Sequence, residues 1–113
     1  MRYALVFRDA GAAEAVWEVM SDDEQDKASD QIGCWFVRHA DRIRHSRHLR
    51  SVVTATTLRW SAGEKASLVD GPFGSESAAV SGYIEVEVTR LEEAIDMLRN
   101  WPFDTLVEIR AIA

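Results

Sequence analysis

The chain has little cysteine, no long apolar run and no excess of positive charge, and each absence narrows what it does. Its single cysteine, Cys34, cannot form an internal disulfide, which agrees with a reducing compartment. The apolar run near the N-terminus is too short for a signal peptide or a membrane span, so we expect a cytoplasmic protein with no membrane association. A net charge of −6 argues against general binding of nucleic acid, because phosphate contacts need a positive field.

Motifs for cofactors and metals are also missing. No cofactor-binding pattern is visible, and we expect no cofactor. The histidines His39, His45 and His48, together with Asp41, match no standard spacing of metal ligands, so we predict no metal site. No repeat, linker or low-complexity segment interrupts the 113 residues, which predicts a single domain over residues 1–113. Its 47% hydrophobic and 28% charged residues are typical of a globular chain.

The first half of the chain predicts strand, helix and strand. Residues 2–8 alternate with apolar side chains on both faces, so both faces of this strand need cover. Residues 12–20 then have apolar side chains at helical spacing, which predicts a short helix or a structured loop after the strand. Ser21 and Glu24 form a capping-box pattern, and the apolar stripe of the helix that follows continues to about residue 43. A short strand over 46–49 follows, and His45 and His48 point to opposite faces there.

The second half predicts four strands and one helix. The strands cover residues 54–60, 66–69, 83–88 and 106–112, and the first two form a hairpin. Ile84, Val86 and Val88 fall on one face of the third of these strands, which predicts that this face is buried. A second capping box, from Thr89 to Glu92, begins the helix.

This order of elements is a split βαβ arrangement. It predicts an α+β, ferredoxin-like fold in which two helices pack on one face of an antiparallel sheet. Two helices cover only one face, yet the strand over residues 2–8 is apolar on both. We therefore expect a second copy of the chain to cover the other face in a two-fold homodimer.

The stretch Asp70-Gly71-Pro72-Phe73 ends a strand pattern abruptly. Gly71 allows a backbone angle that most residues avoid, and Pro72 fixes its own φ and removes a donor from the strand ladder. Asp70 is therefore held at a rigid strand end. Turn chemistry alone leaves two interpretations open, a carboxylate that only closes an Asx-type turn and a carboxylate with a function.

These residues carry a resemblance to a known family. The run from Val69 to Phe73, the following Glu76, the pair Gly82-Tyr83 and a helix near Leu91 resemble the YCII-related family, in particular its DGPF-motif branch. The resemblance covers about residues 48–112. It implies a dimeric α/β barrel with a small-molecule cleft in which an aspartate pairs with a histidine; a few relatives eliminate halide from aromatic substrates.

The match to that family is not complete. Asp70 corresponds to the motif aspartate. The relatives that use a histidine place it early in the first long helix, where residues 22–31 of this chain contain none. Ser77 and Ser81 stand where many DGPF-type relatives carry a lysine and a second glycine. His48 or His45 replaces the family histidine only if its strand runs close to the Asp70 loop.

We predict one small cleft per subunit, lined by Asp70, Phe73, Tyr83 and His48, that binds a small anionic or phenolic molecule. If the protein is catalytic, Asp70 and His48 share general acid/base work in a proton transfer or elimination, and Arg47 or Arg50 holds negative charge. The alternative is a non-catalytic module, either a ligand sensor or a partner of a transcription factor, because genes for DGPF-type proteins often accompany sigma factors.

Overall fold

The computed structural model describes residues 1–8, 17–50, 52–63, 65–74 and 80–113. The strands are β1 (Arg2–Arg8), β2 (Ile43–His48), β3 (Thr56–Arg59), β4 (Ser67–Asp70), β5 (Val80–Glu87) and β6 (Leu106–Ala111). The helices are α2 (Asp22–Arg38) and α4 (Leu91–Arg99), and a short 3-10 turn, η1 (Val52–Thr54), follows β2. The fold is α+β, as the order of sequence patterns predicts.

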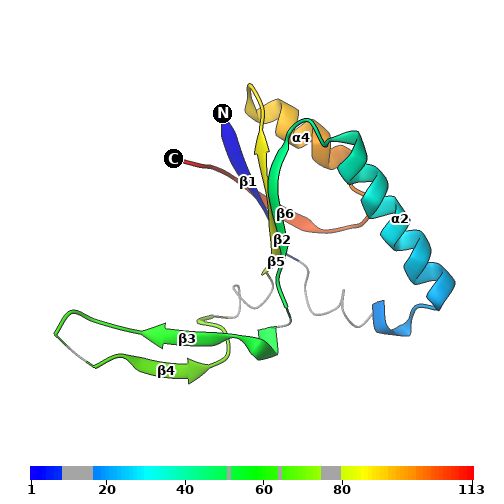
Figure 1. Ribbon diagram of the computed structural model, residues 1–113. Helices are drawn as coiled ribbons and strands as arrows, with labels where there is room; N and C mark the ends of the chain where they lie inside the picture. The colour runs from blue at the N-terminus through cyan, green and yellow to red at the C-terminus, as the bar shows by residue number, and fades with distance from the viewer. Residues whose placement is uncertain (9–16, 51, 64, 75–79) are drawn as a thin grey trace.

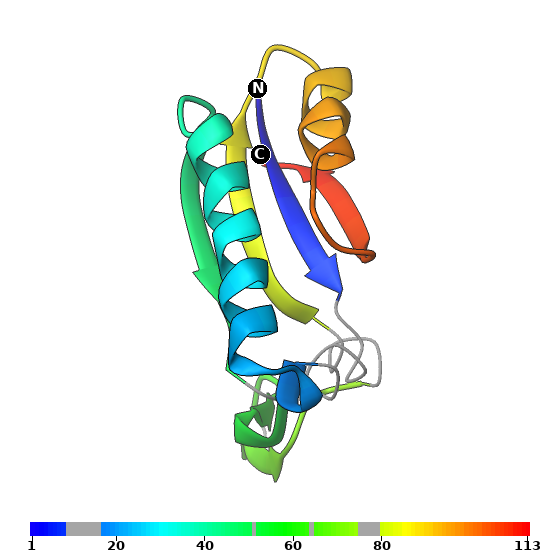
Figure 2. The ribbon, with the colours of Figure 1, turned by 90° about the vertical axis from the view of Figure 1, so that its right-hand side faces the viewer.

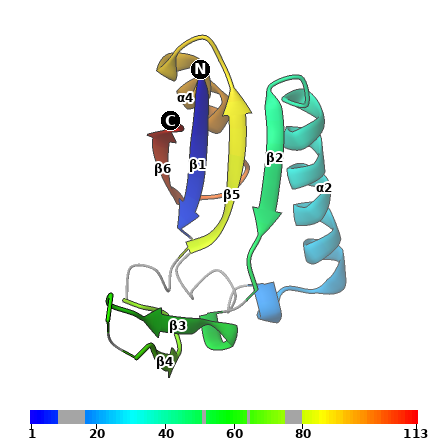
Figure 3. The ribbon, with the colours of Figure 1, turned by 60° about the vertical axis from the view of Figure 1, so that its left-hand side comes forward.

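Four strands form an antiparallel sheet in the order β2-β5-β1-β6 (Figure 3). This arrangement is compatible with a ferredoxin-like fold. Helices α2 and α4 lie on the same face of the sheet, as Figures 1 and 2 show. We call the opposite face, which neither helix covers, the open face.

Alternation along the strands explains which side chains form the core. Leu5 pairs with Ile84 and Tyr3 with Val86 across β1 and β5, and all four side chains are buried. Ala4 and Val6 point to the open face and are half-buried. The prediction that one face of β5 is buried is therefore confirmed.

Helix α2 begins as predicted and ends earlier than predicted. Glu24 N–H donates to Ser21 Oγ at 3.2 Å and Ser21 N–H donates to the Glu24 carboxylate at 3.2 Å, which confirms the capping box. The prediction that the helix runs to about residue 43 is wrong. It ends at Arg38, because His39 caps it and a tight turn follows in which the Ile43 N–H donates to the His39 carbonyl at 3.2 Å.

Trp35 fastens α2 to the rest of the domain. Its indole Nε1 donates to the carbonyl of Met97 at 2.8 Å, and its ring meets Trp101 edge-on with centroids 5.0 Å apart. Trp101 in turn packs against Phe7 of β1, with the ring centroids 4.7 Å apart. The aromatic cluster thus joins both helices to the sheet.

Helix α4 differs in one detail from its predicted start. Its N-cap is Arg90, whose side chain makes no capping hydrogen bond. The Thr89 hydroxyl donates to Glu93 rather than joining Glu92 in a capping box, so the predicted box is wrong by one residue. The short helix or structured loop predicted over residues 12–20 lies mostly outside the described residues, and residues 17–19 are helical. None of the helices in the described ranges is long and apolar enough to cross a membrane.

Strands β3 and β4 form a separate two-stranded hairpin, as predicted, which we call the arm (Figures 1 and 3). It extends from the end of the sheet on the side of the open face (Figure 1). Gly71 at its base has φ 111°, a value that favours glycine. Gly71 N–H donates to the Ala55 carbonyl at 2.7 Å, and the Thr57 hydroxyl donates to the Gly71 carbonyl at 2.6 Å. These bonds close the base of the arm.

Candidate functional site

A cavity of about 250 Å³ lies between α2 and the ends of β2 and β5, and we call it the sheet-end cavity. Its apolar walls come from the sheet, from α2 and from the segment after α4: Phe7, Ile32, Phe36, Ile84 and Trp101. The remaining border is formed by neighbouring residues of two strands: Ser46, Arg47, His48, Ser81, Gly82 and Tyr83. An apolar hollow with a few polar groups on one side is typical of a small-molecule site, although this volume lies just below the usual range of roughly 300–1,000 Å³.

His48 and Ser46 are the polar residues that face the helix side of the sheet. His48 pairs with Gly82 and Ser46 with Ile84, which is buried beneath the helices. Because side chains alternate along a strand, His48 and Ser46 share the face of Ile84. An imidazole and a hydroxyl therefore belong to the same face as the apolar walls.

Gly82 lets β2 approach closely beside His48. A Cβ at this position would stand 2.5 Å from the Arg47 carbonyl oxygen and 3.3 Å from the Cα of His48. Backbone atoms cannot yield as a flexible side chain does, so glycine is required here. The pairing continues past the end of β2, where Leu49 N–H donates to the Ser81 carbonyl at 2.8 Å.

Arg47 and Tyr83 border the cavity from strand positions whose side chains face the open side. They pair with each other, and His45 pairs with Glu85 on the same face. The rings of His45 and Tyr83 lie 5.7 Å apart. His45 and His48 therefore belong to opposite faces, as the alternation predicts, and only His48 borders the cavity.

The other predicted site residues lie elsewhere. Asp70 is exposed at the end of β4 in the arm, and in the described part of the chain its carboxylate forms no hydrogen bond or ion pair with a histidine. Phe73 is 85% exposed and Arg50 is also exposed. None of the three borders the sheet-end cavity. His48, Arg47 and Tyr83 therefore all border the cavity, but the side chain of His48 is on the helix side of the sheet and those of Arg47 and Tyr83 are on the open face. The Asp70–His48 pair stays a prediction.

Charged side chains of the open face form a connected set of ion pairs. Arg2 contacts Glu85 and Glu87, both at 3.2 Å, and Arg44 contacts Glu87 at 3.4 Å. Hydrogen bonding and charge from Arg2, with a further contribution from Arg44, lower the pKa of Glu87. These contacts keep Glu87 ionised, and they occupy the open face rather than the cavity.

The described residues contain no cluster of three or more histidine, cysteine or carboxylate side chains suited to a metal ion. His39, one of the three histidines, is buried at the end of α2, and the centroid of its ring lies 4.9 Å from that of Trp35. The three histidines are thus divided among the end of α2, the open face and the sheet-end cavity.

Sequence reasoning missed several residues that border the cavity. Ser46 and Ser81 stand beside predicted site residues, but a lone serine carries no pattern of its own. The sequence placed Trp101 at the end of a helix and Phe36 in the apolar stripe of another, and neither pattern indicated a cavity. Pairing of β2 with β5 is the signal that joins Ser46 and Ser81, and that pairing follows from the split βαβ order.

Comparisons with known proteins add no family to this geometry. No protein-family model matches the chain, and no curated protein matches it.

Proposed function

We propose that the protein binds a small phenolic or anionic aromatic molecule in the sheet-end cavity. The proposal rests on the lining of this cavity, whose volume is about 250 Å³: His48 and Ser46 border it together with apolar side chains. Walls of this kind favour an aromatic ring, and an imidazole beside them accepts a hydrogen bond from a phenol or, when protonated, pairs with an anion. Cavity size limits the ligand to about one ring with small substituents.

The catalytic form of this proposal assigns proton transfer to His48. An imidazole is suited to general base work near neutral pH, and a phenol or an acidic C–H bound against it would lose its proton to the ring nitrogen. Asp70 is exposed in the arm rather than at the cavity, so the support for binding exceeds the support for an Asp70–His48 pair. We also propose that the chain belongs to the YCII-related, DGPF-type family, on the basis of the residues that resemble its motif.

A thermal-shift series with 4-hydroxybenzoate, phenol and benzoate tests the binding site. A ligand present at 100 Kd stabilises the folded state by about 2.7 kcal/mol, which corresponds to a rise in Tm of roughly 10 °C for a domain of this size. We expect at least one probe to raise the Tm of the wild type, and His48→Gln to lose most of that rise. His45→Gln is the matched control, because it makes the same change on the open face.

Asp70→Asn separates this proposal from a site at the Asp70 loop. If the ligand lies in the sheet-end cavity, Asp70→Asn keeps the full rise in Tm. A rise that is lost in Asp70→Asn and retained in His48→Gln would place the ligand at the arm and contradict the proposal.

A second candidate function is a non-catalytic module that senses a ligand or contacts a transcription factor. The observation that favours it is the exposure of the arm, whose Leu58 and Leu68 pair with each other and are 57% and 72% exposed. This candidate predicts ligand binding without turnover, so a probe that binds and remains chemically unchanged by mass spectrometry supports it.

We also propose a homodimer in which a second copy covers the open face. The support is that α2 and α4 both lie on the other face (Figure 1), while apolar residues remain on this one. Val6 is half-buried, Leu106 is 66% exposed and Ile112 is 41% exposed. Symmetric two-fold pairing is the commonest way to cover such a surface.

A further inference from the structure

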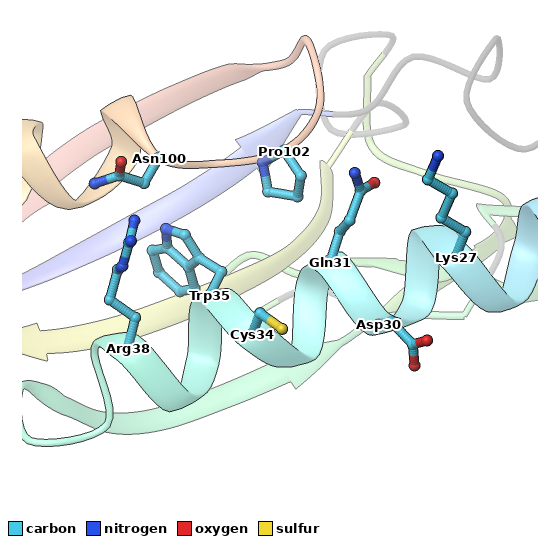
Figure 4. A pocket seen from close by; sticks show the side chains of 8 residues that line it. All are labelled: Lys27, Asp30, Gln31, Cys34, Trp35, Arg38, Asn100 and Pro102. Carbon is cyan, nitrogen blue, oxygen red and sulfur yellow. The ribbon is translucent and has the colours of Figure 1, made fainter.

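A second hollow, which we call the α2 groove, runs between α2 and the segment that follows α4 (Figure 4). Its volume is about 400 Å³, within the range of small-molecule sites. Lys27, Gln31, Cys34 and Arg38 line it at successive spacings of four, three and four residues, and so form one stripe along the helix. Asn100 and Pro102 form the opposite wall. The groove is separate from the sheet-end cavity, with which it shares none of these residues.

Trp35, Asn100 and Pro102 form the part of the groove that is fixed before any ligand arrives. Trp35, which lies between the two walls, is 3% exposed and bonded through Nε1 to Met97 of α4. Asn100 is the C-cap of α4, and its N–H donates to the Leu98 carbonyl. Pro102 has a ring-fixed φ. A ligand finds these three residues in place, and it orders the exposed side chains of Lys27 and Arg38 when it binds.

The groove holds cations that the protein leaves unpaired. In the described part of the chain, neither Lys27 nor Arg38 forms an ion pair with a carboxylate. Asp30 also borders the groove, but Figure 4 shows its carboxylate pointing away from the side chains of Lys27 and Gln31. What distinguishes Lys27 and Arg38 from other exposed basic side chains is that both line the same hollow.

Arg38 and Asn100 face each other across one end of the groove (Figure 4). A guanidinium presents a planar fork of donors that matches a carboxylate or a phosphate, and a side-chain amide adds further donors to the same group. Lys27 lies eleven residues from Arg38, about 16 Å along the helix axis at 1.5 Å per residue. Positive charge therefore stands at both ends of an elongated hollow.

We propose that the α2 groove binds an elongated organic anion. Its carboxylate or phosphate group is held by Arg38 and Asn100, its apolar body lies against Trp35 and Pro102, and a second acidic group, where the ligand has one, reaches Lys27. The ligand class differs from that of the sheet-end cavity, which takes a single compact ring. Binding at the groove does not depend on that cavity being occupied.

Cys34 provides the readout, because it is the only cysteine, is exposed and lies in the middle of the groove. The experiment measures the rate at which iodoacetamide alkylates Cys34 in the full chain, with and without each probe. The probes are sebacate, which is an elongated dicarboxylate, octyl phosphate, which is an elongated phosphate monoester, and the neutral 1,8-octanediol. We expect a saturating anion to slow alkylation at least fivefold and the diol to have no effect. Protection by sebacate alone identifies a carboxylate ligand, and protection by octyl phosphate alone identifies a phosphate ligand.

Three variants locate the anion, each compared with its own rate in the absence of probe. Arg38→Gln should lose the protection. Arg99→Gln, which removes the same charge beside Asn100 from a residue that does not border the groove, should keep it. His48→Gln should also keep it, so failure at the sheet-end cavity is distinguishable from failure here. The proposal is overturned if no anion protects, if the diol protects equally, if Arg38→Gln remains protected, or if His48→Gln loses protection.

Discussion

His39 is the residue whose chemistry departs most from its surroundings. It is 7% exposed, and its Nε2 is buried with no hydrogen-bond partner among the described residues. Burial lowers its pKa below the ordinary 6.5, and the nearby charges of Arg42 and Arg38 lower it further, whereas Asp41 opposes them. The folded protein therefore holds His39 neutral under conditions in which the unfolded chain protonates it.

We predict that His39 makes the protein less stable in mild acid. As the pH falls below 6.5, His39 becomes protonated in the unfolded chain but stays neutral in the folded state, whose His39 pKa is lower. The free energy of unfolding therefore decreases as the pH falls from the unfolded-state pKa toward the folded-state pKa. Urea unfolding at pH 7.5 and 5.5 measures the loss. His39→Phe keeps a ring beside Trp35 and removes the titration, so it should lose less stability between the two pH values. Equal losses in both proteins would contradict this account.

Gly82 offers a second test at the residue scale. Gly82→Ala places a methyl group against the backbone of β2, and relief requires the two strands to move apart. We expect a loss of roughly 1–3 kcal/mol in the free energy of unfolding, the usual cost of overpacking. Gly33→Ala is the matched control, because nothing lies within 4 Å of a Cβ there and alanine favours a helix. Wild-type stability in Gly82→Ala would contradict this prediction, because it would mean that β2 moves away from the methyl group at little cost in free energy.

At the scale of elements, the start of α2 is fixed by local chemistry and its end by packing. The reciprocal hydrogen bonds of Ser21 and Glu24 were predictable from two letters of sequence, because capping acts between residues three apart. The end was not predictable, because Ile43 continues the helical spacing equally well as the first residue of β2. Ile43 belongs to a strand because it pairs with Val86 of β5, and this pairing joins segments that are distant in the sequence.

Ser21→Ala tests the local contribution to α2. The substitution removes the acceptor for the Glu24 N–H at the helix start, and we expect a loss of about 1 kcal/mol in the free energy of unfolding. Ser29→Ala, an exposed position within the same helix, should change stability little or raise it slightly. Chemical denaturation of both variants measures the difference. A loss at Ser29 as large as that at Ser21 would assign the effect to serine removal in general.

The candidate site shows the same division between local and distant contacts. Sequence patterns were enough to select His48, Arg47 and Tyr83, which border one cavity because β2 pairs with β5. They did not anticipate that the residues after η1 form an arm of their own, which carries Asp70 on a different sheet. A hairpin pattern specifies which two strands pair, but it contains no information on whether a larger sheet accepts them.

The whole molecule is broad and thin, with extents of 49 × 40 × 18 Å. Its radius of gyration is 16.6 Å, larger than the roughly 13 Å expected for a compact domain of this length. The arm accounts for this shape, since it extends beyond the sheet (Figures 1 and 3). A two-stranded hairpin is marginally stable alone in water. The arm, which lies on the side of the open face (Figure 1), therefore lacks the packing that stabilises a two-stranded hairpin, and a second copy on that side would supply it.

Val6→Lys tests the proposed homodimer at this scale. Val6 is half-buried at the centre of the open face, and it pairs with Tyr83 and Glu108. In a single subunit a lysine there reaches solvent beside Glu108, so the fold should survive with an unchanged circular dichroism spectrum. In a dimer the same ammonium group is buried, at a cost of about 3 kcal/mol or more, which weakens association roughly 100-fold or more. Sedimentation equilibrium should therefore show a dimer for the wild type and a monomer for Val6→Lys.

Val37→Lys is the matched control. It adds the same charge at a residue of α2 that is 79% exposed, and it should remain dimeric. A monomeric wild type, or a dimeric Val6→Lys, would mean that the open face does not pair with a second copy.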